Sequence, residues 1–155
     1  KILHPFIIIC MIVLVGWQTY DNVKTKYNDK FIDETQYPVK ACDYILENID
    51  LSKARFYNEY NYGSYMIYRG IPVFIDSRAD LYAPEFSGLK DDIFTDFIDV
   101  SSIGTFYEDI LEKYNITHVI LYSNSKMSMI IDETKDPHYS KIYKDDYFVI
   151  YERVK

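Results

Sequence analysis

The chain opens with a block of apolar side chains before any regular alternation of apolar and polar positions begins. The unbroken run FIIICMIVLV starts at Phe6 and is followed by Trp17 and Tyr20. A helix needs about 20 mostly apolar residues to cross a bilayer, and aromatic side chains are common at the membrane–water interface. We therefore expect a transmembrane helix over residues 1–20, as the last span of a larger protein.

Two alternatives stay open for this segment. It is also compatible with a helix buried in a globular core, or with a signal peptide, although no small-residue cleavage site follows the apolar run. The polar segment 21–36 is expected to form a juxtamembrane helix or a linker, and its lysines are interleaved with acids as on a solvated face.

From residue 37 onward, helical spacing alternates with short apolar runs that are typical of strands. Pro38 suits the first turn of a helix, and Ser125 suits a helix N-cap. The predicted helices cover residues 38–50, 63–68, 84–97, 101–115 and 126–132. The predicted strands cover residues 54–58, 71–75 and 117–122, and a hairpin covers 141–153.

This order predicts a layered α-β-α domain over residues 37–155, with a small, mostly parallel sheet and a closing C-terminal β-hairpin. Residues 71–75 (IPVFI) are apolar on both faces, as in a parallel strand that is covered on two sides. Pro72 has no amide donor, so it fits only the start of such a strand or an edge strand.

Composition and charge narrow the function classes. The chain has 17 basic and 24 acidic residues, a net charge of −7, so it lacks the basic footprint of a nucleic-acid-binding protein. The cysteines, Cys10 and Cys42, and the three scattered histidines show no metal-ligand spacing. We therefore expect no metal and no cofactor. The 17 tyrosines suit a carbohydrate or partner surface, or simply reflect base composition.

Polar residues gather where the strands 54–58 and 71–75 are predicted to end. If the chain stays extended after residue 75, Asp76, Arg78 and Asp80 project to one side. The predicted helix at residues 63–68 should begin at the same edge, and its start offers free N–H groups to a phosphate or carboxylate. The candidate ligand-binding residues are Asn58, Tyr60, Gly63, Ser64, Asp76, Arg78, Asp80 and Tyr82.

The alternative for Arg78 is structural: it ties down a loop by pairing with both acids. The aspartates between residues 91 and 99 lack the pattern of a calcium loop and are expected on a solvated helix face. No nucleophile elbow, activated cysteine or glycine-rich phosphate loop is present in the sequence.

The stretch RFYNEYNYGSYMIYRGIPVFIDSRADLY (residues 55–82) resembles the run FNxYxxGGYLIWRxxPVFIDGRADLY of certain bacterial multi-spanning membrane proteins. These proteins are classed with polyprenyl-phosphate-sugar-dependent glycosyltransferases that resemble dolichyl-phosphate-mannose mannosyltransferases. The tail KIYKDDYFVIYERV resembles the closing hairpin of that family. Ser64 stands where the family often has a second glycine, and Ser77 stands where it has glycine.

The resemblance implies an extracytoplasmic domain that hangs from the last membrane helix of a larger enzyme. In this family the catalytic acid lies in an early loop that is outside this sequence, so no residue here is assigned as catalytic. The domain would assist acceptor or lipid-linked sugar binding, or brace the membrane bundle. Its partners would be membrane lipid, a polyprenyl-phosphate sugar, a glycan or protein acceptor, and the rest of the parent protein. The alternative is a non-enzymatic structural or partner-binding domain.

Overall fold

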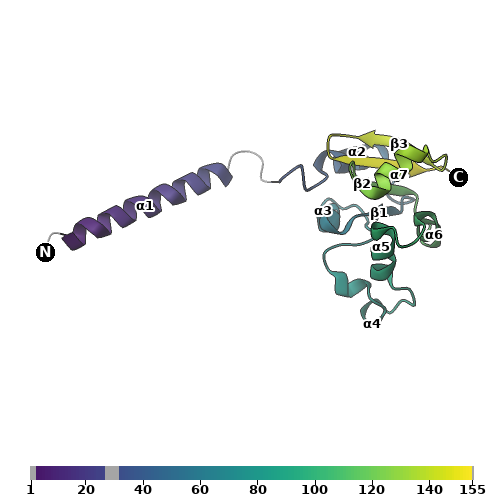
Figure 1. The fold of residues 1–155 in the computed structure, drawn as a ribbon, viewed down its shortest axis with the longest axis horizontal. Helices are drawn as coiled ribbons and strands as arrows, with labels where there is room; N and C mark the ends of the chain where they lie inside the picture. Colours follow the sequence, from purple (N-terminus) through teal and green to yellow (C-terminus); the bar gives the residue numbers. More distant parts are fainter. Residues whose placement is uncertain (1–2, 27–31, 155) are drawn as a thin grey trace. The chain divides into compact units, whose positions relative to one another are not determined.

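The computed structural model describes residues 3–26 and 32–154, and it separates into two compact units, Lys1–Asp33 and Glu34–Lys155. The first unit contains one helix, α1 (Leu3–Lys26) (Figure 1). Its stretch His4–Asn22 is long and apolar enough to cross a membrane, and none of it is buried. Of the predicted juxtamembrane segment, residues 27–31 lie outside the described residues.

The second unit is built on a four-stranded sheet with the order β1-β2-β4-β3 (Figure 1). The strands are β1 (Phe56–Asn58), β2 (His118–Tyr122), β3 (Tyr139–Lys144) and β4 (Phe148–Arg153). The mixed α/β class and the closing hairpin are confirmed. Only β1 and β2 are parallel, however, and β4 runs antiparallel to both of its neighbours, so the sheet is mixed rather than mostly parallel.

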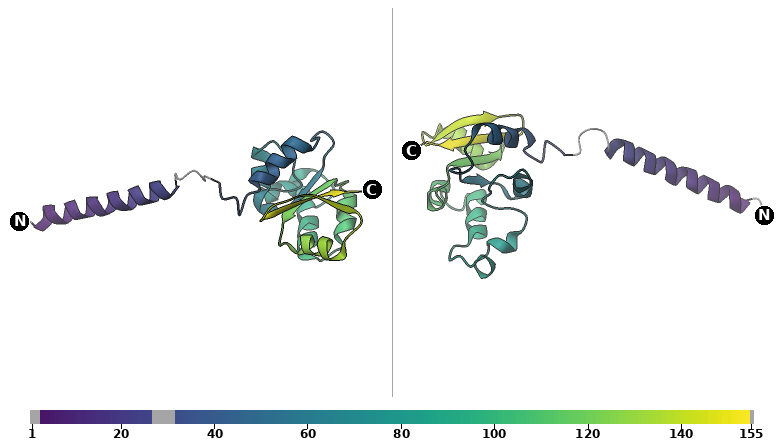
Figure 2. Two further views of the ribbon diagram at one scale, coloured as in Figure 1. Left: turned by 90° about the horizontal axis from the view of Figure 1, so that it is seen from above. Right: turned by 180° about the vertical axis from the view of Figure 1, so that it is seen from behind.

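Helices cover both faces of this sheet (Figure 2). Val119 and Leu121 of β2 join the core beneath the helices α5 (Ile93–Ser102), α6 (Tyr107–Lys113) and α7 (Lys126–Thr134). The helix α2 (Val39–Asn48) contacts the other face, where Tyr44 packs on Tyr143 with ring centroids 5.0 Å apart. Alternation of side chains along the strands supplies an apolar surface to each layer.

The predicted strand at residues 71–75 is not a strand in the structure, which explains why the sheet is not mostly parallel. This segment is held to β1 by the buried amide of Asn58 instead of by a backbone ladder. The Phe74 N–H donates to Asn58 Oδ1 at 2.8 Å, and Asn58 Nδ2 donates to the Ile75 carbonyl at 2.8 Å. One side chain thus satisfies backbone groups that a neighbouring strand would otherwise bind.

The helical region after residue 83 also differs from the prediction. The expected helix 84–97 is split into α4 (Pro84–Ser87) and α5, because Gly88 takes a left-handed conformation (φ 69°) between them. Asp92 then caps α5 by accepting a hydrogen bond from the Thr95 N–H at 2.9 Å. The serines at 101 and 102 end α5 instead of starting α6.

Shorter elements lie between β1 and α4. They are the 3-10 helix η1 (Tyr60–Tyr62), the α-helix α3 (Gly63–Tyr68) and the 3-10 helix η2 (Ala79–Tyr82). The predicted end of α3 at Gly70 is confirmed, since this residue has φ 77°. Ser125 caps α7 as predicted, and its hydroxyl accepts from the Ser128 N–H at 3.2 Å.

Candidate functional site

Most of the sequence-predicted site residues meet around the carboxyl end of β1. Asn58 ends the strand and is fully buried. The hydroxyl of Tyr60 donates to the Ser77 carbonyl at 3.0 Å, and the hydroxyls of Ser64 and Ser77 lie 2.8 Å apart. These contacts join η1 and the start of α3 to the segment that follows Ile75.

Gly63 permits this close approach. A Cβ at this position would lie 2.0 Å from the Ile75 carbonyl oxygen and 2.9 Å from the Asp76 Cα. Only a residue without a side chain fits there. Because Gly63 is buried against this backbone, the start of α3 serves packing, and the predicted anion-binding role of its N–H groups is not favoured.

Asp76, Arg78 and Tyr82 form a compact cluster, which we call the Arg78 cluster. The Asp76 carboxylate is fully buried and accepts four hydrogen bonds. Arg78 donates from Nε at 2.9 Å, from Nη2 at 2.6 Å and from its backbone N–H at 2.8 Å, and the Tyr82 hydroxyl donates at 2.7 Å. The Arg78 guanidinium holds the pKa of Asp76 at about 2, although burial acts in the opposite direction.

The same cluster confirms only one part of the alternative in which Arg78 ties down a loop by pairing with two acids. Arg78 does tie its loop down, but through Asp76 alone. The chain does not stay extended after residue 76, because the 3-10 helix η2 begins at Ala79 and ends the alternation of side chains before Asp80. Asp80 is exposed, and its side chain makes no hydrogen bond or ion pair with any residue that the structure describes. The Arg78 side chain remains 60% exposed and points an oriented guanidinium toward solvent.

Glu59 is a site residue that the sequence reasoning missed. It follows Asn58 directly and lies partly buried at the carboxyl ends of the parallel strands β1 and β2. Burial raises the pKa of Glu59 to about 7, and hydrogen bonds from the Tyr122 backbone and the Ser125 side chain only partly oppose this rise. Its position next to a strand end was the only signal in the sequence.

A cleft of about 530 Å³ opens beside Glu59, between η1 and α5. Of the sequence-predicted residues, only Tyr60 lines it. The lining residues are Glu59, Tyr60, Asn61, Phe94, Phe97, Ile98 and Ser101. We call this the Glu59 cleft. It combines aromatic rings with a carboxyl, an amide and a hydroxyl group, which is the usual make-up of a small-molecule site.

We compared the chain with known proteins. No protein-family model matches it, and no curated protein does either. The resemblance to membrane glycosyltransferases therefore stays a prediction that is based on the residues quoted above.

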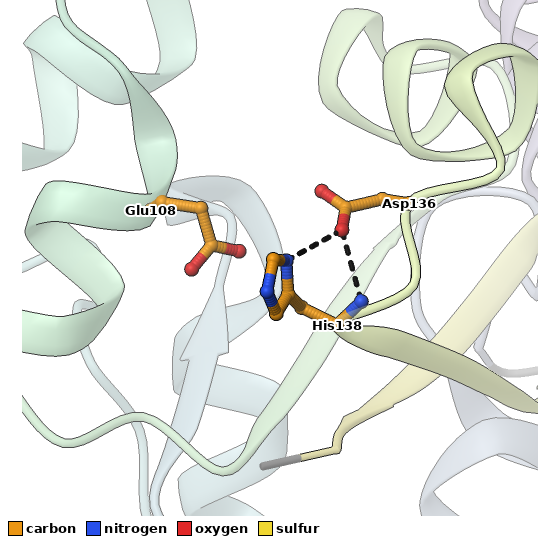
Figure 3. Close-up of side chains that lie close together, drawn as sticks. All are labelled: Glu108, Asp136 and His138. Atoms are coloured by element: carbon orange, nitrogen blue, oxygen red, sulfur yellow. Dashed lines mark hydrogen bonds and ion pairs between the residues drawn. The ribbon is translucent and has the colours of Figure 1, made fainter.

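A second polar cluster brings together Glu108, Asp136 and His138, with ligand atoms within 4.8 Å of one another (Figure 3). Asp136 Oδ1 accepts from the backbone N–H of His138 at 3.0 Å and lies 3.0 Å from its ring Nδ1. Its other oxygen accepts from Tyr107 at 2.6 Å.

This second cluster is better explained as a structural cross-link than as a metal centre. Glu108 Oε2 pairs with the guanidinium of Arg153 at 3.1 Å, and a cation placed beside that guanidinium would be repelled. Glu108 Oε1 has no hydrogen-bond partner among the described residues, and that alone does not make a cation site. Only the pair Asp136 and His138 is close enough in sequence to have been noticed beforehand.

Proposed function

We propose that this chain is a membrane-anchored domain on the extracytoplasmic side of a glycosyltransferase-like membrane protein. In this proposal the Arg78 cluster contacts an anionic group of the acceptor or of the lipid-linked sugar. The catalytic acid is supplied by another part of the parent protein. The domain holds the substrate or closes over it.

The observation that carries this proposal is the exposed, pre-oriented guanidinium of Arg78. Two of its nitrogens are bound by a buried carboxylate, while 60% of the side chain stays exposed. An arginine that is fixed in this way loses little side-chain entropy when it binds a phosphate or carboxylate. The long, apolar and unburied helix α1 supports the membrane anchor.

The test uses cells that lack the parent gene and are complemented with the wild type or with Arg78→Ala. Arg69→Ala is the matched control, because Arg69 also pairs with an aspartate, Asp43, but it follows the last residue of α3 and is not part of the Arg78 cluster. The measurements are the profile of cell-envelope glycans and lipid-linked sugars, and the amount of folded protein in the membrane fraction.

We expect Arg78→Ala to leave folded protein in the membrane while a glycan is lost or a lipid-linked sugar accumulates. Arg69→Ala should keep the wild-type profile. A folded Arg78→Ala protein that restores the full wild-type profile would contradict the proposal. If Arg78→Ala fails to accumulate, Arg78→Lys keeps the charge without the two-pronged fork, and it should still alter the profile.

A second candidate function, bracing of the parent protein, is favoured by exposed apolar side chains around η2 and α4. Leu81, Phe86 and Leu89 are 50%, 70% and 54% exposed. Phe86→Ser should then lower the amount of intact parent protein in the membrane without changing the thermal stability of the isolated chain. An unchanged amount would exclude this role for Phe86.

A further inference from the structure

The Glu59 cleft is a second candidate site, separate from the Arg78 cluster. Its floor is built from rings that are fixed in place. Phe97 is only 6% exposed, and the rings of Tyr60 and Phe94 meet edge to face with centroids 6.3 Å apart. The Tyr60 ring also lies 6.4 Å from that of Phe97, and its hydroxyl is held by the Ser77 carbonyl. The aromatic surface is therefore preformed.

Polar groups stand around this floor. Glu59 and Asn61 come from the end of β1 and from η1, and Ser101 comes from the last turn of α5. A carboxyl, an amide and a hydroxyl group together offer both donors and acceptors. No lysine or arginine is among the lining residues that the structure describes, so the cleft has nothing to neutralise a phosphate or a carboxylate.

The nature of Glu59 limits the ligand further. Its environment disfavours negative charge, since burial raises its pKa to about 7. A neutral ligand fits better, because the carboxyl group can then accept or donate a hydrogen bond near neutral pH.

From this combination we infer that the Glu59 cleft binds a neutral saccharide of one or two sugar rings. The C–H face of a pyranose ring can lie on Tyr60 and Phe94, while its hydroxyl groups bind Glu59 and Asn61. The volume of about 530 Å³ lies within the usual range for small-molecule sites. The inference concerns a different site from the Arg78 cluster, and it deepens the proposed function by naming an uncharged sugar as the ligand of the cleft.

The experiment measures binding of cellobiose and of N,N′-diacetylchitobiose to the full chain by saturation-transfer NMR and titration. The chain is held in nanodiscs of phosphatidylethanolamine and phosphatidylglycerol, which carry neither sugar nor quaternary ammonium head groups. Tetramethylammonium serves as the cation probe. We expect at least one disaccharide to bind the wild type and tetramethylammonium not to bind.

Two neighbouring serines provide a matched pair of variants. Ser101 and Ser102 are both exposed at the end of α5, and both donate a hydrogen bond to the Ile98 carbonyl, but only Ser101 lines the cleft. Ser101→Trp should fill the cleft and weaken disaccharide binding by about tenfold or more, whereas Ser102→Trp should leave the Kd unchanged. Circular dichroism checks that both variants are folded.

Each other outcome overturns the inference. Absence of binding by both disaccharides removes the saccharide assignment, and binding that survives Ser101→Trp moves the site elsewhere. An equal loss in both variants shows that the cleft is not specifically involved. Binding of tetramethylammonium in place of the sugars makes the cleft a cation site. These readouts do not depend on the glycan profile, so this inference and the proposed function can fail separately.

Discussion

At the scale of single residues, Glu59 and Asp76 are two acids near the end of β1 whose pKa values move in opposite directions. Asp76 is fully buried, but the bidentate Arg78 guanidinium favours its ionised form and holds its pKa at about 2. No cation among the described residues acts on Glu59 in this way, so burial dominates and its pKa rises to about 7. The partner therefore matters more than the depth of burial.

Glu59 should make the stability of the fold depend on pH in a defined window. Between its ordinary pKa of 4.5 and about 7, the folded state binds more protons than the unfolded state, so the free energy of unfolding falls as pH rises. The full effect is about 3 kcal/mol. Glu59→Gln removes this titration, and its stability should be less dependent on pH between about pH 5 and pH 8.

Chemical denaturation at several pH values measures this difference. Glu47→Gln is the control, because Glu47 is an exposed glutamate on α2. A Glu59→Gln protein with the wild-type slope would show that burial of this carboxyl group is not costly. Asp76 contributes in the opposite sense and at lower pH: its stabilisation is lost as pH falls through about 2.

At the scale of elements, the irregular segment 71–76 is fixed between β1 and α3 by two different devices. The Asn58 amide binds its backbone at Phe74 and Ile75, and Gly63 lets α3 touch it directly. Neither device depends on regular secondary structure. The segment is therefore held by a buried side chain and by close packing, although it contributes no backbone ladder to the sheet.

Gly63→Ala separates helix propensity from packing. Alanine in a helix is favoured over glycine by about 1 kcal/mol, so propensity alone predicts a more stable protein. A Cβ 2.0 Å from the Ile75 carbonyl oxygen must instead displace backbone. We expect packing to dominate and the variant to lose about 1–3 kcal/mol or more in thermal or denaturant unfolding.

Ser64→Ala is the control for this variant, since Ser64 is exposed and loses only its hydrogen bond to Ser77. Its stability should change by no more than about 0.5 kcal/mol. A Gly63→Ala protein that is as stable as the wild type, or more so, would show that α3 and the segment 71–76 can move apart freely.

At the scale of the whole molecule, the chain combines an unburied apolar helix with a domain that has its own core. The described side chains of α1 from Phe6 to Trp17 are exposed, while the second unit buries residues from both faces of its sheet. Such a helix is costly to leave in water. A bilayer would cover it, although a signal peptide can satisfy the same criteria of length and hydropathy.

Charges in the middle of α1 test the anchor. In the double variant Ile12→Lys/Val13→Lys, each lysine should cost about 2.5–3.5 kcal/mol in a bilayer. The variant should therefore move from the membrane fraction to the soluble fraction. Tyr20→Lys is the control, because a lysine at the interface can extend its charge to water. Retention of the double variant in the membrane would contradict anchoring by α1. A mature chain without α1 would favour the signal peptide.

Local patterns in the sequence predicted those elements whose formation depends on neighbouring residues. The apolar helix at the start, α2, the strand β2, the Ser125 cap and the closing hairpin each follow from spacing, capping or turn residues within a few positions. The pairing of Asp76 with Arg78 belongs to the same group, since the two are only two residues apart.

Only the tertiary structure decided the rest. The segment 71–75 has the apolar pattern of a strand, but the Asn58 amide binds its backbone in place of a neighbouring strand. The 3-10 helix η2 likewise ends the extended chain before Asp80. The Glu59 cleft likewise joins η1 to α5, which lie more than 30 residues apart in the chain. A sequence pattern indicates whether each side chain prefers to be buried. Which residues then surround that side chain depends on contacts between segments that are distant in the chain.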